Sequence, residues 1–475
     1  MRSGRSARRA AVAAATLAWA GLAGVPALAE TPGDAGATPG GAAAPGGLEI
    51  PYQKVVLDNG LELILHEDRS LPLVAVNLWY HVGPANEPAG RSGFAHLFEH
   101  LMFEGSRHVG AEFDRLMESA GATNVNGTTS WDRTNYFETL PREQLELALW
   151  IESDRMGFML ETLSEERLEV QRGVVKNERR QSYENAPYGP STLAMYDSLF
   201  PLGHPYHGAV IGSMQDLDAA TIDDVRDFHR SFYAPSNATL VIAGDFDPSQ
   251  ALRWVQRYFG SLPKRAKPAR RQAVTPPLAA PVQRVVEEPV ELGRVAFAWI
   301  VPPAFSADNA VLDVTMALFA GGRATRLYQA LVVGKKLSPD VSASLDSNQL
   351  ASIAEVSAMV ASGVSDAEVT AELEAQIEKL AVEGPSPAEL ARAKRRLLVP
   401  LKSEVLLLNG GGGESGRAGL LQRFNHYLGN PGFLSAWVGQ IEAVSAADVQ
   451  RAVRKHLGGE TRATIVTRPK PGAGS

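Results

Sequence analysis

The chain has 475 residues and no cysteine, with 45% hydrophobic residues, 21% charged residues and a net charge of −7. Its length exceeds one typical domain, and its composition is that of a folded globular protein. The acidic balance argues against nucleic acid or an anionic membrane surface as a partner, and the lack of cysteine excludes disulfides, thiolate metal ligands and a cysteine nucleophile.

The first 29 residues have the pattern of a secretory signal peptide. A basic segment, an apolar run and an Ala-x-Ala cleavage site follow one another: Arg2, Arg5, Arg8 and Arg9, then 10–20, then 27–29. We expect export to the periplasm of a Gram-negative bacterium and no membrane span after cleavage; an uncleaved anchor is the alternative. Cleavage removes four positive charges and no negative ones, which takes the net charge from −7 to −11. Residues 30–48 are rich in Gly, Ala and Pro and predict a disordered tether.

Residues 49–262 predict a first folded domain. Two strand-like runs flank the hairpin tripeptide Asp58-Asn59-Gly60, and an apolar strand at 73–82 precedes a helix that carries histidines. A further strand and two long helices are expected at 134–140, 142–159 and 165–184.

The helix expected at 94–104 contains His-x-x-Glu-His, formed by His96, Glu99 and His100. At i and i+4, two imidazoles lie on one face of a helix and can hold one Zn²⁺. Glu99 lies beside them and can take a proton from a water activated by the metal. This residue order is the inverzincin signature. The neighbouring residues are apolar, so the helix is expected to be buried, and a metal would compensate for burying three ionisable groups. The alternative is a buried helix whose histidines only form hydrogen bonds.

Residues 263–282 predict a linker, because they are rich in Pro, Lys, Arg and Ala and have no periodicity. A second domain is expected at 283–469, with a short tail at 470–475. Its predicted elements are strands at 293–301 and 353–360, a helix at 307–319, further long helices and a last strand.

The two domains share a pattern of a helix that leads into a short apolar strand. Residues 223–226 and 238–241 in the first domain correspond to 447–450 and 463–466 in the second. This repeat favours a duplicated α+β domain. The segment 224 residues after His96 carries no metal ligands, so only the first copy is expected to be catalytic.

These features resemble the pitrilysin and insulin-degrading enzyme family of zinc metallopeptidases, which includes the mitochondrial processing peptidases. The resemblance runs from Tyr52 to Arg468 and is greatest to short exported bacterial members built from two homologous halves. Besides the histidine motif, it rests on residues 90–93, 149–156, 203–206 and 228–235. It implies an α+β fold with two homologous mixed-sheet domains in a clamshell arrangement, and metalloendopeptidase activity on unfolded proteins or peptides.

A zinc peptidase needs a third protein ligand, and the residues alone leave six helical carboxylates open: Glu152, Glu165, Glu166, Glu169, Glu178 and Glu184. The family's third ligand closes a Val-Val-x-x-Glu pattern, which here is 174–178. The resemblance therefore implies His96, His100 and Glu178 as ligands of one Zn²⁺ per chain. Seven positions before Glu178 the family has an acidic residue, whereas this chain has Gln171, which keeps a hydrogen-bond donor but removes a charge near the metal.

The resemblance also implies a substrate-binding edge strand that includes Asn126, Gly127 and Thr128, to which an extended peptide would add as a further strand. Glu99 would be the general base. Five other histidines lack ligand spacing and are interpreted as structural or surface residues: His81, His108, His204, His207 and His229. The four-glycine run 410–413 has no P-loop residues and is interpreted as a hinge or loop.

The second half departs from the family pattern at two positions. Family members that act alone place an Arg and a Tyr seven residues apart there, where this chain has Val332 and Pro339. Neither residue has a side-chain donor. We therefore expect a heterodimer with a homologous subunit that supplies the Arg and Tyr, or else a homodimer. A noncatalytic scaffold or chaperone-like subunit of a peptidase complex is one alternative, and a non-peptidase metal-binding protein is another.

Overall fold

The computed structural model describes residues 38–39, 48–272 and 275–471. The expected signal peptide, most of the tether and the last four residues of the tail lie outside the described residues. Within the expected tether, strand β1 (Thr38–Pro39) pairs antiparallel with β2 (Gln53–Val56). No helix in the described part of the chain is both long enough and apolar enough to cross a membrane.

The N-terminal half contains one mixed sheet of seven strands, in the order β1-β2-β3-β7-β4-β6-β5. Its other strands are β3 (Glu62–Glu67), β4 (Leu73–Tyr80), β5 (Thr123–Ser130), β6 (Arg133–Pro141) and β7 (Ala238–Gly244). Its helices are α1 (Phe94–Leu101), α2 (Phe113–Ser119), α3 (Leu145–Phe158), α4 (Glu165–Arg179), α5 (Gly189–Leu199), α6 (Met214–Ala219), α7 (Ile222–Phe232) and α8 (Pro248–Tyr258). Short 3₁₀ turns occur at Pro84–Asn86, Arg142–Gln144, Met159–Glu161 and Pro235–Asn237, and the π-helical turn η4 (Arg180–Glu184) continues α4.

The C-terminal half contains a five-stranded mixed sheet in the order β10-β11-β9-β12-β8. The strands are β8 (Val282–Glu288), β9 (Arg294–Val301), β10 (Val341–Asp346), β11 (Ser352–Met359) and β12 (Arg462–Pro469). The helices are α9 (Asn309–Phe319), α10 (Asp366–Glu383), α11 (Pro387–Glu404), α12 (Gly416–Leu428), α13 (Leu434–Ala443) and α14 (Ala446–His456). A π-helical segment η6 (Tyr328–Gly334) and the 3₁₀ turns η7 (Gly411–Gly413) and η8 (Gly459–Thr461) complete this half.

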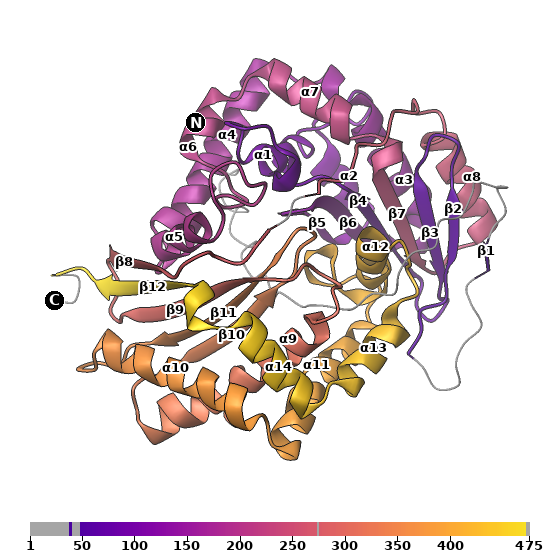
Figure 1. Cartoon of the computed structure of the whole chain (residues 1–475). Helices are drawn as coiled ribbons and strands as arrows, with labels where there is room; N and C mark the ends of the chain where they lie inside the picture. Colours follow the sequence, from indigo (N-terminus) through magenta and orange to yellow (C-terminus); the bar gives the residue numbers. More distant parts are fainter. Residues whose placement is uncertain (1–37, 40–47, 273–274, 472–475) are drawn as a thin grey trace.

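Both halves have the same strand order, which supports the duplication. The central strand β7 pairs parallel with β3 and antiparallel with β4, and β12 pairs in the same way with β8 and β9. Read from β3 and from β8, both sheets end in an edge strand, β5 or β10. The predicted α+β class, with one mixed sheet in each half, is confirmed (Figure 1).

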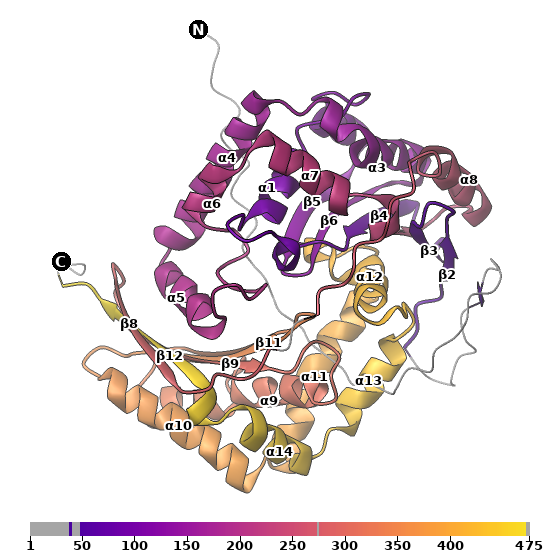
Figure 2. The ribbon, with the colours of Figure 1, turned by 45° about the horizontal axis from the view of Figure 1, so that its top comes forward.

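Each sheet is covered on one face by helices of its own half and on the other by a helix of the opposite half. Helix α12 packs on β4 and β7, and the side chains of Ile64 and Val241 belong to the same hydrophobic core as the C-terminal half. Helix α5 packs on β8, β9 and β12, where Leu199 lies in one cluster with Ala298 and Ile465. Figure 2 shows α5 above the C-terminal sheet and α12 beside the N-terminal one. The two halves therefore exchange helices rather than only facing each other.

The predicted elements differ from the structure mainly at their ends. The helix expected at 142–159 is helical in its middle as α3 and is flanked by 3₁₀ turns, and the one expected at 165–184 changes from α-helix to π-helix at Arg180. Strands β8 and β10 had no counterpart among the predicted elements, because their polar and exposed residues hide the strand pattern.

Candidate metal centre

Helix α1 is preceded by Gly93, at a position where the backbone leaves no room for a side chain. Gly93 has a φ of 87°, and a Cβ there would lie 2.7 Å from the carbonyl oxygen of Ile211. The free backbone N–H groups of the first turn are bound by a carboxylate: Gly93 N donates to Glu87 Oε2 at 3.0 Å and Ala95 N donates to Glu87 Oε1 at 2.8 Å. These contacts fix where the helix starts and so fix the direction of its histidines.

The side chains of His96, His100 and Glu178 converge, with one ligand atom of each within 4.8 Å of the others. Helix α4 packs on α1 and carries Glu178 in its last turn. Glu178 Oε1 lies 3.7 Å from His96 Nε2, and Glu178 Oε2 lies 3.3 Å from His100 Nε2. Of the six open carboxylates, Glu178 is thus the one that the packing of α4 brings to both histidines.

This donor set fits zinc. In a tetrahedral site with bonds of about 2.0–2.2 Å, neighbouring ligand atoms are about 3.3–3.6 Å apart. The two separations to Glu178 are close to that range, so small shifts of the side chains would complete three of the four ligand positions. Nδ1 of His96 is buried and has no hydrogen-bond partner among the described residues, which leaves that ring oriented by packing alone.

Burial and pairing set the charges of the three groups. Burial lowers the pKa of His96 and so favours its neutral form, the form that binds metal. Burial also opposes the charged form of His100, but the hydrogen bond that His100 donates to Glu178, the negative charges of Glu99 and Glu178 and a hydrogen bond with Gln171 together raise the pKa of His100. Burial would raise the pKa of Glu178, but the hydrogen bond from His100 and the charges of both histidines together lower it. His100 and Glu178 therefore each favour the charged form of the other, and a divalent cation bound to both would compete with the proton on His100.

Glu99 lies between α1 and the edge strand β5. It is buried, and its Oε2 accepts a hydrogen bond from Thr129 Oγ1 at 2.6 Å. A Cβ on Gly127 would lie only 3.1 Å from Glu99 Cγ, so a glycine at this position lets the carboxylate pack against the strand. Asn126 and Thr128 lie on the same edge strand, opposite Phe137 and Asn135 of β6.

Gln171 touches the histidine pair from α4. Its side chain donates to Glu104 and also forms a hydrogen bond with His100. The position that was expected to act behind the ligands therefore contacts one of them. An amide there orients His100 without adding a negative charge.

The structure places neither Val332 nor Pro339 in a polar role. Val332 lies in η6 and packs against the C-terminal core, and Pro339 is exposed just before β10. The nearby Arg326 is bound to Glu389 at 2.8 Å and to the carbonyl of Gly384 at 2.6 Å, so its guanidinium is engaged within the C-terminal half. These contacts give Arg326 a structural role.

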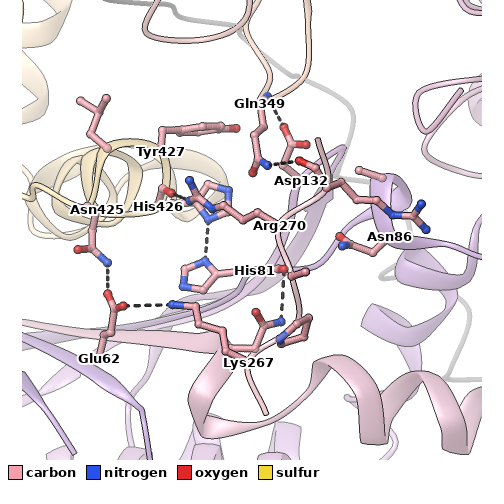
Figure 3. Close-up of a pocket in the computed structure, with 17 residues that line it drawn as sticks. Glu62, His81, Asn86, Asp132, Lys267, Arg270, Gln349, Asn425, His426 and Tyr427 are labelled. Carbon is pink, nitrogen blue, oxygen red and sulfur yellow. Dashed lines mark hydrogen bonds and ion pairs between the residues drawn. The ribbon is translucent and has the colours of Figure 1, made fainter. Parts of the chain in front are cut away.

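The other histidines make contacts of their own: His108 with Asp154, His204 with Thr275, His207 with the carbonyl of Phe200, and His229 with the rings of Phe98 and Tyr233. His81 is different, since it stacks on His426 of the other half, with the two Nδ1 atoms 2.6 Å apart. This pair borders a cavity of about 390 Å³ between the halves and the linker (Figure 3). Sequence reasoning missed this contact, because nothing local to His81 indicates that α12 covers it.

Comparisons with known proteins agree with the geometry. Residues 63–193 match the family model described as Insulinase (Peptidase family M16), and residues 219–397 match the one described as Peptidase M16 inactive domain. The chain is 30% identical over 295 residues to the zinc protease PqqE of Helicobacter pylori. That alignment spans 60% of this chain and 65% of the relative, so the chain covers slightly less than two thirds of it.

Solved structures extend the likeness over most of the chain. A protease from Helicobacter pylori superposes with a TM-score of 0.81 at 26% identity, over 88% of this chain and 99% of that one. The periplasmic protease PqqL from Escherichia coli superposes with a TM-score of 0.73 at 20% identity, over 91% of this chain and 49% of that one, which shows a shared fold. The chain belongs to the M16, or insulinase, family of peptidases.

Proposed function

We propose that the protein is a zinc-dependent endopeptidase that cleaves extended peptides and unfolded proteins. The observation that carries this proposal is the convergence of His96, His100 and Glu178 beside Glu99, with Glu99 next to an edge strand. The catalytic domain would be 49–262, joined by the linker 263–282 to a noncatalytic domain at 283–469.

The three converging side chains would hold one Zn²⁺, which when bound supplies Lewis-acid chemistry and a water of lowered pKa. Glu99 accepts the proton of the attacking water and later passes it to the leaving amine. Thr129 holds the Glu99 carboxylate through its 2.6 Å hydrogen bond, and so limits the positions from which Glu99 can act. Gln171 orients His100 through a side-chain hydrogen bond.

A peptide would bind by adding a strand to the free edge of β5. In the described residues β5 ends the sheet, so the backbone groups of the segment Asn126–Thr128 that point away from β6 have no strand partner. Strand addition requires an extended substrate, and it selects unfolded chains over compact ones.

The test combines a zinc assay with turnover of a quenched fluorescent peptide. We expect about one Zn²⁺ per chain. Glu99→Gln should keep the zinc and lower kcat by at least about 10²–10⁴, because it removes the base and leaves the ligands. Exposed Glu287 offers a matched control, and Glu287→Gln should behave as the parent does. Full activity in Glu99→Gln would refute this mechanism.

We further propose that the protein is exported to the periplasm, because its first 29 residues have the pattern of a signal peptide. We also propose that it works with a homologous subunit, because Val332 and Pro339 leave the C-terminal half without the two expected donors. A homodimer is the second candidate. A noncatalytic scaffold is a weaker candidate, since the metal group is intact in the described residues. Sequencing the N-terminus of the purified protein would test cleavage after residue 29.

A further inference from the structure

A loop of the C-terminal half, the glycine loop Asn409–Glu414, lies on the sheet of the N-terminal half. Its backbone carbonyls accept hydrogen bonds from polar side chains of that sheet. Asn77 Nδ2 on β4 donates to Gly413 O at 2.8 Å, and Asn135 Nδ2 on β6 donates to Gly412 O at 3.1 Å. Between its two ends, where the side chains of Asn409 and Glu414 bind Asn77 and Arg133, the loop contacts the sheet through its backbone carbonyls.

The glycine loop runs outward across the sheet toward the edge strand. A Cβ on Gly413 would lie 2.4 Å from the Phe137 ring of β6, so at Gly413 the backbone touches that strand. The next residue outward, Gly412, accepts from Thr128 Oγ1 of β5 at 3.2 Å. Gly411 follows, is exposed, and would have no atom within 4 Å of a Cβ. From Gly413 to Gly412 the loop therefore reaches from β6 to β5, and the space next to Gly411 is open.

Strand β5 lies between the metal group and the glycine loop. Successive side chains of a strand point to opposite faces of the sheet. On one face, Thr129 binds Glu99 and Gly127 packs against it. On the other face, Thr128 binds Gly412. A peptide strand added beside β5 would alternate in the same way, so every second side chain would point to the face of the glycine loop.

We propose that the glycine loop is a specificity subsite that receives alternate side chains of a bound peptide and favours large ones. This inference rests on the proposed strand addition to β5. Gly411 has no side chain and nothing within 4 Å of where a Cβ would lie, so it leaves room for substrate atoms that any other residue would fill.

The subsite selects by size rather than by charge. Glu414, which ends the loop, is already paired with the buried guanidinium of Arg133. The same guanidinium donates to Thr128 O at 2.8 Å, so it also ties the loop to the edge strand. The remaining surface of the loop is neutral backbone, which contacts apolar side chains without a desolvation penalty for a free charge.

The test fills the open space at Gly411. Gly411→Leu places a side chain there, at a residue whose φ is not positive. The matched control is Gly439→Leu, another exposed glycine with nothing within 4 Å, on α13 and away from β5. The probes are extended peptides of Ala in which Phe replaces one position at a time around the cleaved bond. Binding is measured with the Glu99→Gln forms, and turnover is measured with the forms that retain Glu99.

In the parent protein, Phe at every second position of the peptide should strengthen binding and lower KM. Gly411→Leu should weaken binding and raise KM by about 10-fold at those positions only, with kcat nearly unchanged, as expected when a pocket loses room for a side chain. Gly439→Leu should keep the parental pattern. If Gly411→Leu leaves binding and KM unchanged, or weakens binding equally at adjacent peptide positions, the proposed subsite is wrong.

The two proposals fail separately. If the parent shows no zinc-dependent cleavage that Glu99→Gln removes, the proposed function is wrong, yet binding by the Glu99→Gln forms still reports on the loop. If cleavage is normal and Phe has no alternating effect on binding, the subsite alone is wrong.

Discussion

The two halves share a strand order but differ in the helix that follows two equivalent strands, β4 in the N-terminal half and β9 in the C-terminal half. In the N-terminal half this is α1, whose His96 and His100 side chains are 12% and 23% exposed and face Glu178 of α4. In the C-terminal half it is α9, in which every one of the 11 residues is buried. Helices α11 and α14 and strand β10 enclose α9, so no face of it is free for a ligand.

This contrast separates what the fold requires from what the chemistry requires. Both helices fill the same place in the architecture, but only α1 has one face left open and ionisable residues on that face. The fold therefore accepts a fully buried helix without a histidine pair equally well, and the metal group is an addition to one copy. The predictions below test how far this separation of roles holds.

The largest expected effect is loss of the metal. His96→Ala, His100→Ala and Glu178→Ala each remove one of three ligands, and we expect bound zinc to fall from about one per chain to a small fraction, with activity lost. His456→Ala is the matched change in the other half, where His456 pairs with Asp308 at 2.7 Å. It should leave the zinc content unchanged. Elemental analysis measures the zinc content of the ligand variants and of His456→Ala. Zinc retained in His96→Ala would contradict the assignment of His96 as a ligand.

The second prediction asks whether the C-terminal half lacks a catalytic contribution. Missing donors at a developing oxyanion typically cost about 10²–10³ in rate. If Val332 and Pro339 replace such donors, the lone chain should be slow. Co-expression with a homologous subunit that has Arg and Tyr at these positions should then raise kcat by a similar factor and give a 1:1 complex in sedimentation analysis. A lone chain as fast as the pair would remove the need for a partner.

The sequence predicts the local part of the site well, because the spacing of His96, Glu99 and His100 is a property of one helix. It does not predict Glu178 on physical grounds. Six carboxylates are available on helices, and only the packing of α4 on α1 chooses one of them. The family resemblance supplied the choice that local patterns could not.

The sequence also does not predict that each half places a helix on the sheet of the other half. An amphipathic pattern says that one face of α12 is buried, but not against which sheet. Gln422 on α12 is fully buried, and its Nε2 donates to the carbonyls of Asn77 and Thr239 in the other half. A polar residue at that position looks like a surface residue in the sequence, so both the exchange and the contact of the glycine loop with β5 had to come from the structure.

A third prediction concerns the exchanged helices. Leu199 of α5 and Leu421 of α12 are fully buried in clusters that join the halves. Leu199→Ala and Leu421→Ala should each lower the free energy of unfolding by about 2–5 kcal/mol, and both halves should still unfold in one transition. Leu202→Ala, at a residue that is 86% exposed, should change it by less than about 0.5 kcal/mol. Urea denaturation followed by fluorescence and circular dichroism provides the measurement, and two separate transitions would show that the halves are independent.

The smallest expected effect is a pH dependence of the contact between the halves. Glu62 on β3 accepts a hydrogen bond from Asn425 of α12 at 2.7 Å and lies 3.0 Å from Lys54 Nζ. Burial alone would raise the pKa of Glu62, but these two partners outweigh it and lower the pKa from 4.5 to about 2. Because the folded-state pKa is the lower one, the stabilisation is complete above about pH 4.5 and is lost as the pH falls toward 2.

Glu62→Gln should therefore reduce the unfolding free energy by about 1–2 kcal/mol at neutral pH, allowing for solvent screening of a partly exposed pair, and the difference from the parent should shrink toward pH 2. Metal-free protein is used for both, so that zinc loss in acid does not contribute. Glu67→Gln, at an exposed ion pair with Arg69 on the same strand, should follow the parental profile. If the difference in unfolding free energy between Glu62→Gln and the parent stays constant with pH, Glu62 acts through its shape and hydrogen bond. Its charge then does not hold the two halves together.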